Sequence, residues 1–305
     1  MRIPEYLSPT SIHIWQDDEE LFYQRYLSEF RLPREPQTQP QSIGSAFDAY
    51  VKCYIYKCVF GKEEEPYILK NLFENQVEEH NRNWAWEHGK LVFDQYKKAG
   101  CIADIMLELE KAVGPPNFEF EIRDTIQGIP LLGKPDIFFI SDKGFRVIYD
   151  WKVNGYCSSN LKSPMKGYLK LREKGKLEKS HKNCVPALHG GITINADMFL
   201  EEGDKSWADQ ESVYAWLLGE NIGSENWVSG IDQICGPASR LRFATHRCRV
   251  SSTWQQGFFD VAKELWDRIN SGWFFRHLSE EDSKNLCNLL DEVNKEELDG
   301  GYAAV

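Results

Sequence analysis

Hydrophobic residues recur at helical spacing through most of the first third of the chain. In residues 43–60 they return at steps of three and four, which predicts a helix with one buried face. Residues 10–30 have an amphipathic helical pattern, and residues 67–113 are predicted to be largely helical up to Gly114-Pro115-Pro116. Residues 1–114 are therefore expected to form a helical region.

The pattern changes to short apolar and alternating segments after that point. Residues 118–122 alternate as a strand and are predicted to lead into a hairpin. The hairpin consists of the apolar run 137–140 and of residues 146–153, which are rich in β-branched and aromatic side chains, with a turn at 141–144. Further along, strands are predicted at 227–234 and 241–250, and helices from about 206 and over 254–272.

Three charged residues on this hairpin have the arrangement of a divalent-metal site. Asp150 and Lys152 share one face of their strand, because side chains of a strand alternate between faces. Tyr149 and Trp151 take the other face. The hairpin also brings Asp136, which precedes the first strand, close to Asp150. The catalytic candidates are therefore Asp136, Asp150 and Lys152.

This set of residues suits phosphodiester hydrolysis. Carboxylate oxygens are the ligands that Mg²⁺ and Mn²⁺ prefer. A metal held there can lower the pKa of a bound water and neutralise charge on a phosphate. A lysine beside it can orient the water or stabilise developing negative charge. The alternative is a surface hairpin with an ordinary Asp-Lys pair.

Four blocks of the sequence resemble the PD-(D/E)XK nucleases, in the order that family has them. The similarity is to the RecB-like branch, which includes the CRISPR-associated RecB-like exonucleases and the nuclease domains of RecB and AddB, and more distantly to lambda exonuclease. Together the blocks span roughly residues 8–220. They are residues 8–12 with 21–27, residues 43–49, residues 133–136 with 150–152, and residues 210–214.

The resemblance implies an α/β fold with a restriction-endonuclease-like core, in which helices flank a central mixed β-sheet. It implies a Mg²⁺- or Mn²⁺-dependent DNA exonuclease that acts in DNA processing, recombination or repair. The metal would be held by Asp48, Asp136, Asp150 and the backbone carbonyl of Trp151. The family's "Q-x-x-x-Y" block places Gln210 and Tyr214 against DNA or behind the metal site.

Glu121 and Asp48 each leave an alternative open. Relatives often carry a catalytic acid where Glu121 stands, but a solvated strand face explains Glu121 equally well. The family has a metal-binding histidine at the position of Asp48. Asp48 is therefore either a harder replacement ligand or a polar helix residue of a site that has lost a ligand.

Cysteine spacing argues against an iron–sulfur cluster. Many relatives hold a four-iron cluster with one N-terminal and three C-terminal cysteines. Here residues 15–18 contain no cysteine, and Cys235, Cys248 and Cys287 are widely spaced. We therefore expect Mg²⁺ or Mn²⁺ and no cluster.

The net charge of −11 conceals two basic segments. Residues 161–182 carry eight Lys and Arg against two Glu, and four arginines lie between 240 and 249. A focused basic surface can bind DNA phosphates, although most charge runs are solvated faces. The candidates for DNA contact in these segments are Lys166, Lys170, Arg172, Lys174, Lys176 and Arg242.

We expect one domain over residues 1–305, with a nuclease core at about 115–275, a basic insertion at 154–205 and an acidic tail at 279–305. The absence of a signal-peptide pattern and the scattered cysteines predict a cytoplasmic bacterial protein, or a phage protein in its host. DNA is the expected partner, with a helicase, a single-strand annealing protein or an integrase as further candidates, no membrane, and a homo-oligomer left open. The alternative function is a nucleic-acid-binding subunit of a recombination or CRISPR-adaptation complex with a degenerate nuclease site.

Overall fold

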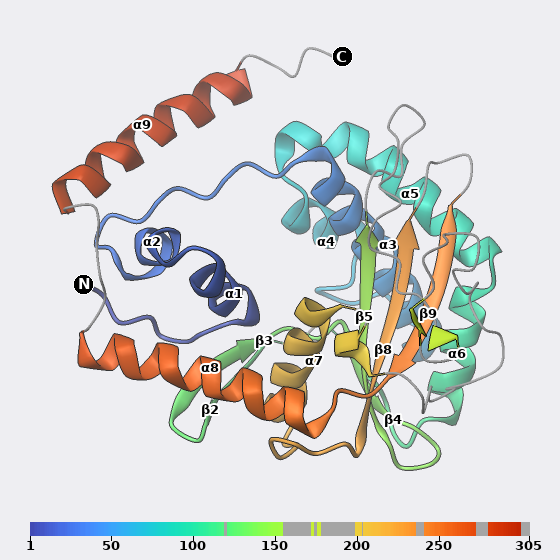
Figure 1. The fold of residues 1–305 in the computed structure, drawn as a ribbon. Coiled ribbons are helices and arrows are strands. Elements are labelled where there is room, and N and C mark those ends of the chain that lie inside the picture. The colour runs from blue at the N-terminus through green and yellow to red at the C-terminus, as the bar shows by residue number, and fades with distance from the viewer. Residues whose placement is uncertain are drawn as a thin grey trace.

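A five-stranded mixed sheet forms the centre of the protein (Figure 1). The computed structural model describes residues 1–118, 121–154, 172–173, 176–177, 199–202, 204–235, 241–272 and 280–299. In spatial order the strands are β1 (Asn117–Phe118), β4 (Ile137–Ile140), β5 (Arg146–Asn154), β8 (Trp227–Cys235) and β9 (Arg242–Cys248). Strands β5 and β8 are parallel, and the other neighbours are antiparallel. The predicted α/β class with a central mixed sheet is therefore confirmed.

Helices cover both faces of this sheet. On one face, α3 (Gln39–Phe60), α5 (Arg82–Lys98) and α6 (Cys101–Lys111) pack against Tyr149 and Trp151 of β5. On the other face, α7 (Lys205–Leu217) packs against Ile148. The alternation of side chains along β5 therefore divides the core into two layers, as the sequence predicts. Helix α7 is also part of the connection that parallel strands β5 and β8 require.

The N-terminal segment is broken where one helix was predicted. It contains α1 (Pro9–Asp17), α2 (Glu19–Phe22) and a π-helix at Tyr23–Leu27. Asp18 has an extended backbone between α1 and α2, and its side chain accepts a hydrogen bond from the Leu21 amide. The prediction of a continuous helix over residues 10–30 is wrong at this point, because Asp18 starts a new helix as its N-cap.

A second hairpin, which the sequence did not predict, lies between β1 and β4. It consists of β2 (Ile122–Ile126) and β3 (Ile129–Gly133), which pair only with each other as strands. Its two-residue turn has positive φ angles of 48° at Gln127 and 89° at Gly128. Such a turn matches the twist of an antiparallel pair. The core hairpin that was predicted to follow residues 118–122 is therefore preceded by a hairpin that the sequence did not predict.

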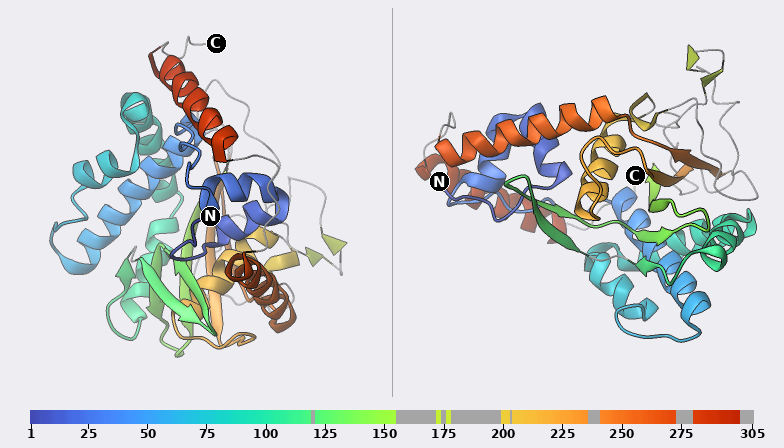
Figure 2. Two further views of the ribbon diagram at one scale, coloured as in Figure 1. Left: turned by 90° about the vertical axis from the view of Figure 1, so that its left-hand side faces the viewer. Right: turned by 90° about the horizontal axis from the view of Figure 1, so that it is seen from below.

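Two further helices pack beside this core, and the C-terminal helix lies apart from the sheet (Figure 1 and Figure 2). Helix α4 (Leu69–Gln76) and a 3₁₀ turn at Glu79–Asn81 precede α5, which confirms the helical prediction for 67–113. Helix α8 (Ser252–Ser271) packs with α1, α7 and β3 around a separate apolar cluster. Helix α9 (Glu280–Asp299) occupies most of the segment predicted as an acidic tail.

Only fragments of the predicted insertion at 154–205 fall within the described residues. They are β6 (Arg172–Glu173), its antiparallel partner β7 (Lys176–Leu177), and a 3₁₀ turn at Leu200–Glu202. None of the helices in the described part of the chain is long and apolar enough to cross a membrane.

Candidate active site

The β4–β5 hairpin brings Asp136 and Asp150 together. Ile137 pairs with Tyr149 in the antiparallel β4–β5 hairpin. Asp136 precedes Ile137 and Asp150 follows Tyr149, so the two aspartates lie opposite each other. The backbone amide of Trp151 donates a hydrogen bond to Asp136 Oδ2 at 2.9 Å. Asp150 is 5% exposed, so its carboxylate lies inside the protein at the face of β5 that α7 covers. The sequence-based proximity of the two acids is confirmed.

Lys152 connects this pair of acids to α7. Its ammonium group contacts the Asp150 carboxylate and donates to Gln210 Oε1 at 2.7 Å. Gln210 Nε2 in turn donates to the hydroxyl oxygen of Tyr214 at 2.5 Å, one helical turn further along α7. Two blocks that lie 58 residues apart in sequence thus meet in one hydrogen-bonded chain. Lys152 is held in one orientation by the carboxylate and the amide.

Gly133 allows α7 to lie this close to the hairpin. A Cβ atom at Gly133 would lie 2.6 Å from the Tyr214 ring and 2.8 Å from Leu217. Contacts that short do not occur in folded proteins, so any larger residue would push α7 away. The glycine three residues before Asp136 therefore has a packing reason that the sequence alone did not supply.

Helix α7 begins two residues earlier than it would with Ser206 and Asp209 as a capping box, which is what their spacing in the sequence predicts. Its N-cap is Asp204, whose carboxylate accepts hydrogen bonds from the Trp207 amide at 3.2 Å and from the Ser206 hydroxyl. The prediction that Ser206 and Asp209 form a capping box is wrong. Asp209 instead contacts His13 Nε2 at 2.8 Å and accepts from Trp254 Nε1 at 2.7 Å.

Asp48 of α3 reaches the same site, but through a lysine that sequence reasoning missed. Lys52 Nζ lies 2.7 Å from Asp48 Oδ2 and 2.8 Å from Asp136 Oδ1. Gln76 Nε2 also donates to Asp48 Oδ2, at 2.9 Å. The only sequence signal for Lys52 was its position one helical turn after Asp48, which puts both side chains on one face of α3.

Glu211 is a second residue that the sequence analysis missed. It follows Gln210 on α7 and is fully buried. Neither carboxylate oxygen has a hydrogen-bond partner of normal geometry among the described residues, although the Ser229 hydroxyl lies near enough to lower its pKa. Burial and the nearby Asp150 charge nevertheless raise the pKa of Glu211 well above its ordinary value. A buried carboxyl without partners is costly and therefore marks a site of interest.

Burial and neighbouring charges push the pKa values of the paired aspartates apart. Burial would raise the pKa of Asp136, but the Lys52 ammonium and nearby hydrogen bonds hold it below its usual range. Burial raises the pKa of Asp150 well above its usual range, the Lys152 ammonium opposes this, and the Asp136 carboxylate reinforces it. Burial would lower the pKa of Lys152, yet the Asp150 charge raises it. Lys152 is thus a cation, and the pKa of Asp136 lies below that of Asp150.

The charge and donor types of this cluster fit one divalent cation. The carboxylates of Asp48, Asp136, Asp150 and Glu211 face the ammonium groups of Lys52 and Lys152, and with all four deprotonated, as metal ligands are, two negative charges are in excess. Oxygen donors of this kind suit Mg²⁺ or Mn²⁺. Within the described part of the chain, no three Asp, Glu, His or Cys side chains converge as a ready-made metal cage. The two ammonium groups already occupy part of the carboxylate oxygens.

Glu121 lies in a different set of contacts. Its carboxylate pairs with Arg123 at 2.6 Å and with Lys134 at 2.7 Å, and these side chains are partly exposed. The hydrogen bonds from Lys134 and Arg123 lower the pKa of Glu121. This arrangement is the solvated strand face that the sequence left as the alternative for Glu121.

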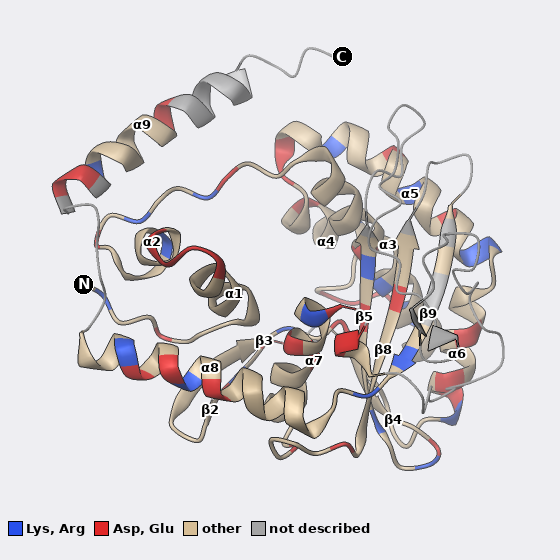
Figure 3. Ribbon diagram, viewed as in Figure 1, with Lys and Arg blue, Asp and Glu red and all other residues tan. Residues whose placement is uncertain are grey.

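The side chains of most of the predicted DNA contacts lie outside the part of the chain that the structure describes. Lys166, Lys170 and Lys174 lie outside the described residues. Arg172, Lys176 and Arg242 are described only as backbone, in β6, β7 and β9. Elsewhere Lys, Arg, Asp and Glu are interspersed over the described helices rather than gathered on one face (Figure 3).

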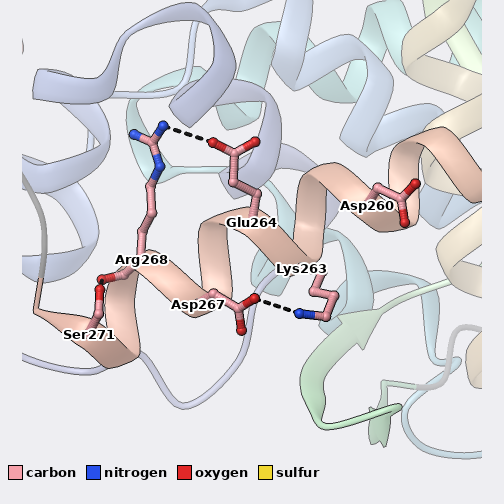
Figure 4. A pocket seen from close by; sticks show the side chains of 6 residues that line it. All are labelled: Asp260, Lys263, Glu264, Asp267, Arg268 and Ser271. Atoms are coloured by element: carbon pink, nitrogen blue, oxygen red, sulfur yellow. Dashed lines mark hydrogen bonds and ion pairs between the residues drawn. The ribbon is translucent and has the colours of Figure 1, made fainter.

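A surface hollow on α8 is separate from the carboxylate cluster (Figure 4). Its charged residues are already paired along the helix, Lys263 with Asp267 at 2.6 Å and Arg268 with Glu264 at 2.8 Å. A second hollow lies between α1 and α8 and is lined partly by Trp254, Phe258 and Asp209. Neither hollow contains the residues of the β4–β5 hairpin.

Comparisons in sequence and structure give weak similarities. No protein-family model and no curated protein matches the chain in sequence. A crystal structure of a "Putative exonuclease" from Eubacterium rectale aligns with a TM-score of 0.47 and 12% identity, over 88% of this chain and 82% of that chain. The crystal structure of SSO0001 aligns with a TM-score of 0.25 and 12% identity, over 72% of this chain and 84% of that chain. Functional conclusions therefore depend on the geometry of the site itself.

Proposed function

We propose that this protein is a divalent-metal-dependent deoxyribonuclease of the RecB-like exonuclease type. The observation that carries the proposal is the hydrogen-bonded set of Asp136, Asp150, Lys152 and Gln210 at the junction of the β4–β5 hairpin with α7. It combines the buried carboxylate of Asp150, the half-buried carboxylate of Asp136, a fixed ammonium group and an excess of negative charge in one place.

Each residue has a role that follows from its position. Asp136 and Asp150 would hold Mg²⁺ or Mn²⁺, with the carbonyl of Trp151 as a backbone donor beside them. A bound divalent cation would polarise the phosphate and lower the pKa of a water. Lys152 would donate to the attacking water or to the phosphate, and Gln210 keeps its ammonium group oriented. Tyr214 fixes Gln210 from the next turn of α7.

DNA binding would come from the basic segment 161–182 and from the arginines between 240 and 249. The segment carries a net charge of +6, from eight basic and two acidic residues, in a chain whose overall charge is −11. Phosphate contacts by lysine and arginine provide most non-specific DNA affinity. A strongly acidic body would keep that affinity confined to these segments.

The test is cleavage of end-labelled linear and circular DNA with Mn²⁺, Mg²⁺ or EDTA. We expect degradation of linear DNA that requires the metal and leaves the circle intact. Asp150→Asn and Lys152→Ala should each lower the rate by ~10²-fold or more while folding is preserved. Asp142→Asn and Lys143→Ala are matched controls, because they lie in the exposed turn of the same hairpin. Near-normal rates in either site variant would place the catalytic site elsewhere.

A second candidate is a DNA-binding protein whose nuclease site is inactive. The observation in its favour is Lys52, whose ammonium group lies between two of the predicted metal ligands. DNA binding without cleavage in any of the three conditions would support this candidate and exclude the nuclease.

A further inference from the structure

Lys52 has the position of a cation bound between two carboxylates. Its ammonium nitrogen is 2.7 Å from Asp48 Oδ2 and 2.8 Å from Asp136 Oδ1, and its side chain is 2% exposed. A buried ammonium group is stable only when it is paired. Asp48 and Asp136 meet that requirement from two different elements, α3 and the start of β4.

A divalent ion bridging Asp48 and Asp136 would need the same oxygens. Mg²⁺ binds carboxylate oxygens at about 2.1 Å and demands near-ideal geometry. The Lys52 ammonium group already lies between Asp48 Oδ2 and Asp136 Oδ1, so an ion that bridged these two oxygens would have to displace it. Lys52 and a bridging metal therefore exclude one another, and α3 would have to move Lys52 away to admit the metal.

We propose that Lys52 is a built-in cation of this site, which neutralises Asp48 and limits the site to a single divalent ion held by Asp136 and Asp150. Asp48 is then the counter-ion of Lys52 and not a metal ligand. This inference rests on the proposed function, since it concerns the same carboxylates. It specifies how many metal ions the site binds. It also gives Asp48, at the position where relatives carry a histidine, a role other than metal binding.

The charge count agrees with this assignment. With Lys52 and Lys152 in place, the four carboxylates in the deprotonated form that binds a metal leave an excess of two negative charges, which one divalent ion balances. Replacing Lys52 by a neutral residue raises the excess to three. The carboxylates of Asp48 and Asp136 would then be freed together and could take a further cation.

The test is a titration of metal-free protein with Mn²⁺. Calorimetry and the electron paramagnetic resonance of bound Mn²⁺ measure the number of ions bound and their affinity. The parent should bind one Mn²⁺. Lys52→Gln should bind a second Mn²⁺, or the first about ten-fold or more tightly, because a repelling charge is gone. Lys90→Gln is the matched control: it removes an exposed lysine paired with Asp94 at the same i,i+4 spacing, and should behave as the parent. Unchanged stoichiometry and affinity in Lys52→Gln would overturn the proposal.

The double variant Asp48→Asn, Lys52→Gln provides a second measurement, because it removes one charge of each sign and leaves neither member of this ion pair buried without the other. Its Mn²⁺ affinity should stay within about two-fold of the parent if Asp48 is the counter-ion of Lys52. A loss of ten-fold or more would make Asp48 a ligand and refute the proposal. These readouts involve no DNA. A protein that shows them but does not cleave DNA would refute the nuclease alone, whereas a protein that cleaves DNA but whose Mn²⁺ binding is unchanged in Lys52→Gln would refute the Lys52 proposal alone.

Discussion

Arg247 is expected to be the side chain whose loss destabilises the fold most, because it is the cation of a buried charge network. Its guanidinium lies 3.4 Å from Glu108 Oε1 and 3.6 Å from Asp232 Oδ1, and donates to the Tyr149 hydroxyl at 3.3 Å. The three charged side chains are between 3% and 5% exposed. This network lies behind β5, on the face opposite Asp150 and Lys152.

The cost of removing Arg247 follows from what it would leave behind. Arg247→Met keeps most of the apolar stem, so lost packing is small. It leaves Glu108 and Asp232 buried without a cation, and burial already raises the pKa of Glu108. Breaking a buried pair from one side typically costs 3–5 kcal/mol, and we expect a loss of roughly that size in the free energy of unfolding. In a chain of this length the melting temperature should fall by on the order of 10 °C.

Urea denaturation of the parent and the variant at pH 7 measures the loss. Lys263→Met is the control, because its ion pair with Asp267 is exposed and such pairs contribute little. The triple variant Arg247→Met, Glu108→Gln, Asp232→Asn should recover part of the stability, since the stranded charges are gone. If Arg247→Met costs no more than the control, the network is not a source of stability and the reasoning fails.

Three other variants test a buried histidine, a packing glycine and the basic insertion. Burial, with the Arg247 charge as the smaller cause, lowers the pKa of His246 from 6.5 to about 3. Between those pH values only the unfolded state gains the proton, so the free energy of unfolding should fall by roughly 1.4 kcal/mol per pH unit below 6.5. Urea titrations at pH 7 and pH 5 should show that His246→Gln removes this part of the pH dependence. Gly133→Ala should cost about 1–3 kcal/mol by overpacking, because its Cβ would meet the Tyr214 ring, and it should slow DNA cleavage more than Gly257→Ala, whose Cβ would meet no atom within 4 Å; equal rates in the two variants would remove the packing argument. Changing the basic residues of the insertion together should weaken the salt dependence of DNA binding, measured in Ca²⁺. The slope of log affinity against log salt concentration should become shallower by ~0.7 to 0.9 per lost phosphate contact. An unchanged slope would mean that these residues form a solvated face and do not contact DNA. That variant replaces Lys170, Arg172, Lys174 and Lys176 by Ala.

The strands and long helices could be predicted because their signals are local. Residues 137–140 and 146–153 are bounded by turn residues and match β4 and β5 closely. The β2–β3 hairpin was missed because its turn is Gln127-Gly128, whereas Asn-Gly or Asp-Gly is the strong signal for a two-residue turn. The break at Asp18 was missed because apolar spacing continues across it and only the capping geometry interrupts the helix.

The site was predictable where its residues are tied by strand alternation or helical spacing. Asp150 with Lys152, and Gln210 with Tyr214, each follow from the period of their own element. Lys52 and Glu211 were missed because their importance comes from contacts between elements. A lysine on a helix or a glutamate beside a glutamine carries no local sign that it will be buried against an aspartate from a distant strand.

The buried charges of this site therefore have to be considered as one set. Asp48 alone suggests a replacement metal ligand, and Lys52 alone suggests an ordinary helix ion pair. Together with Asp136 they form a chain of carboxylate, ammonium and carboxylate in which the lysine already supplies the positive charge. A histidine at position 48 would be neutral or cationic and would leave Lys52 with one carboxylate fewer. The presence of an aspartate there and a lysine one turn later is thus a matched pair of residues, whose charges cancel inside the site.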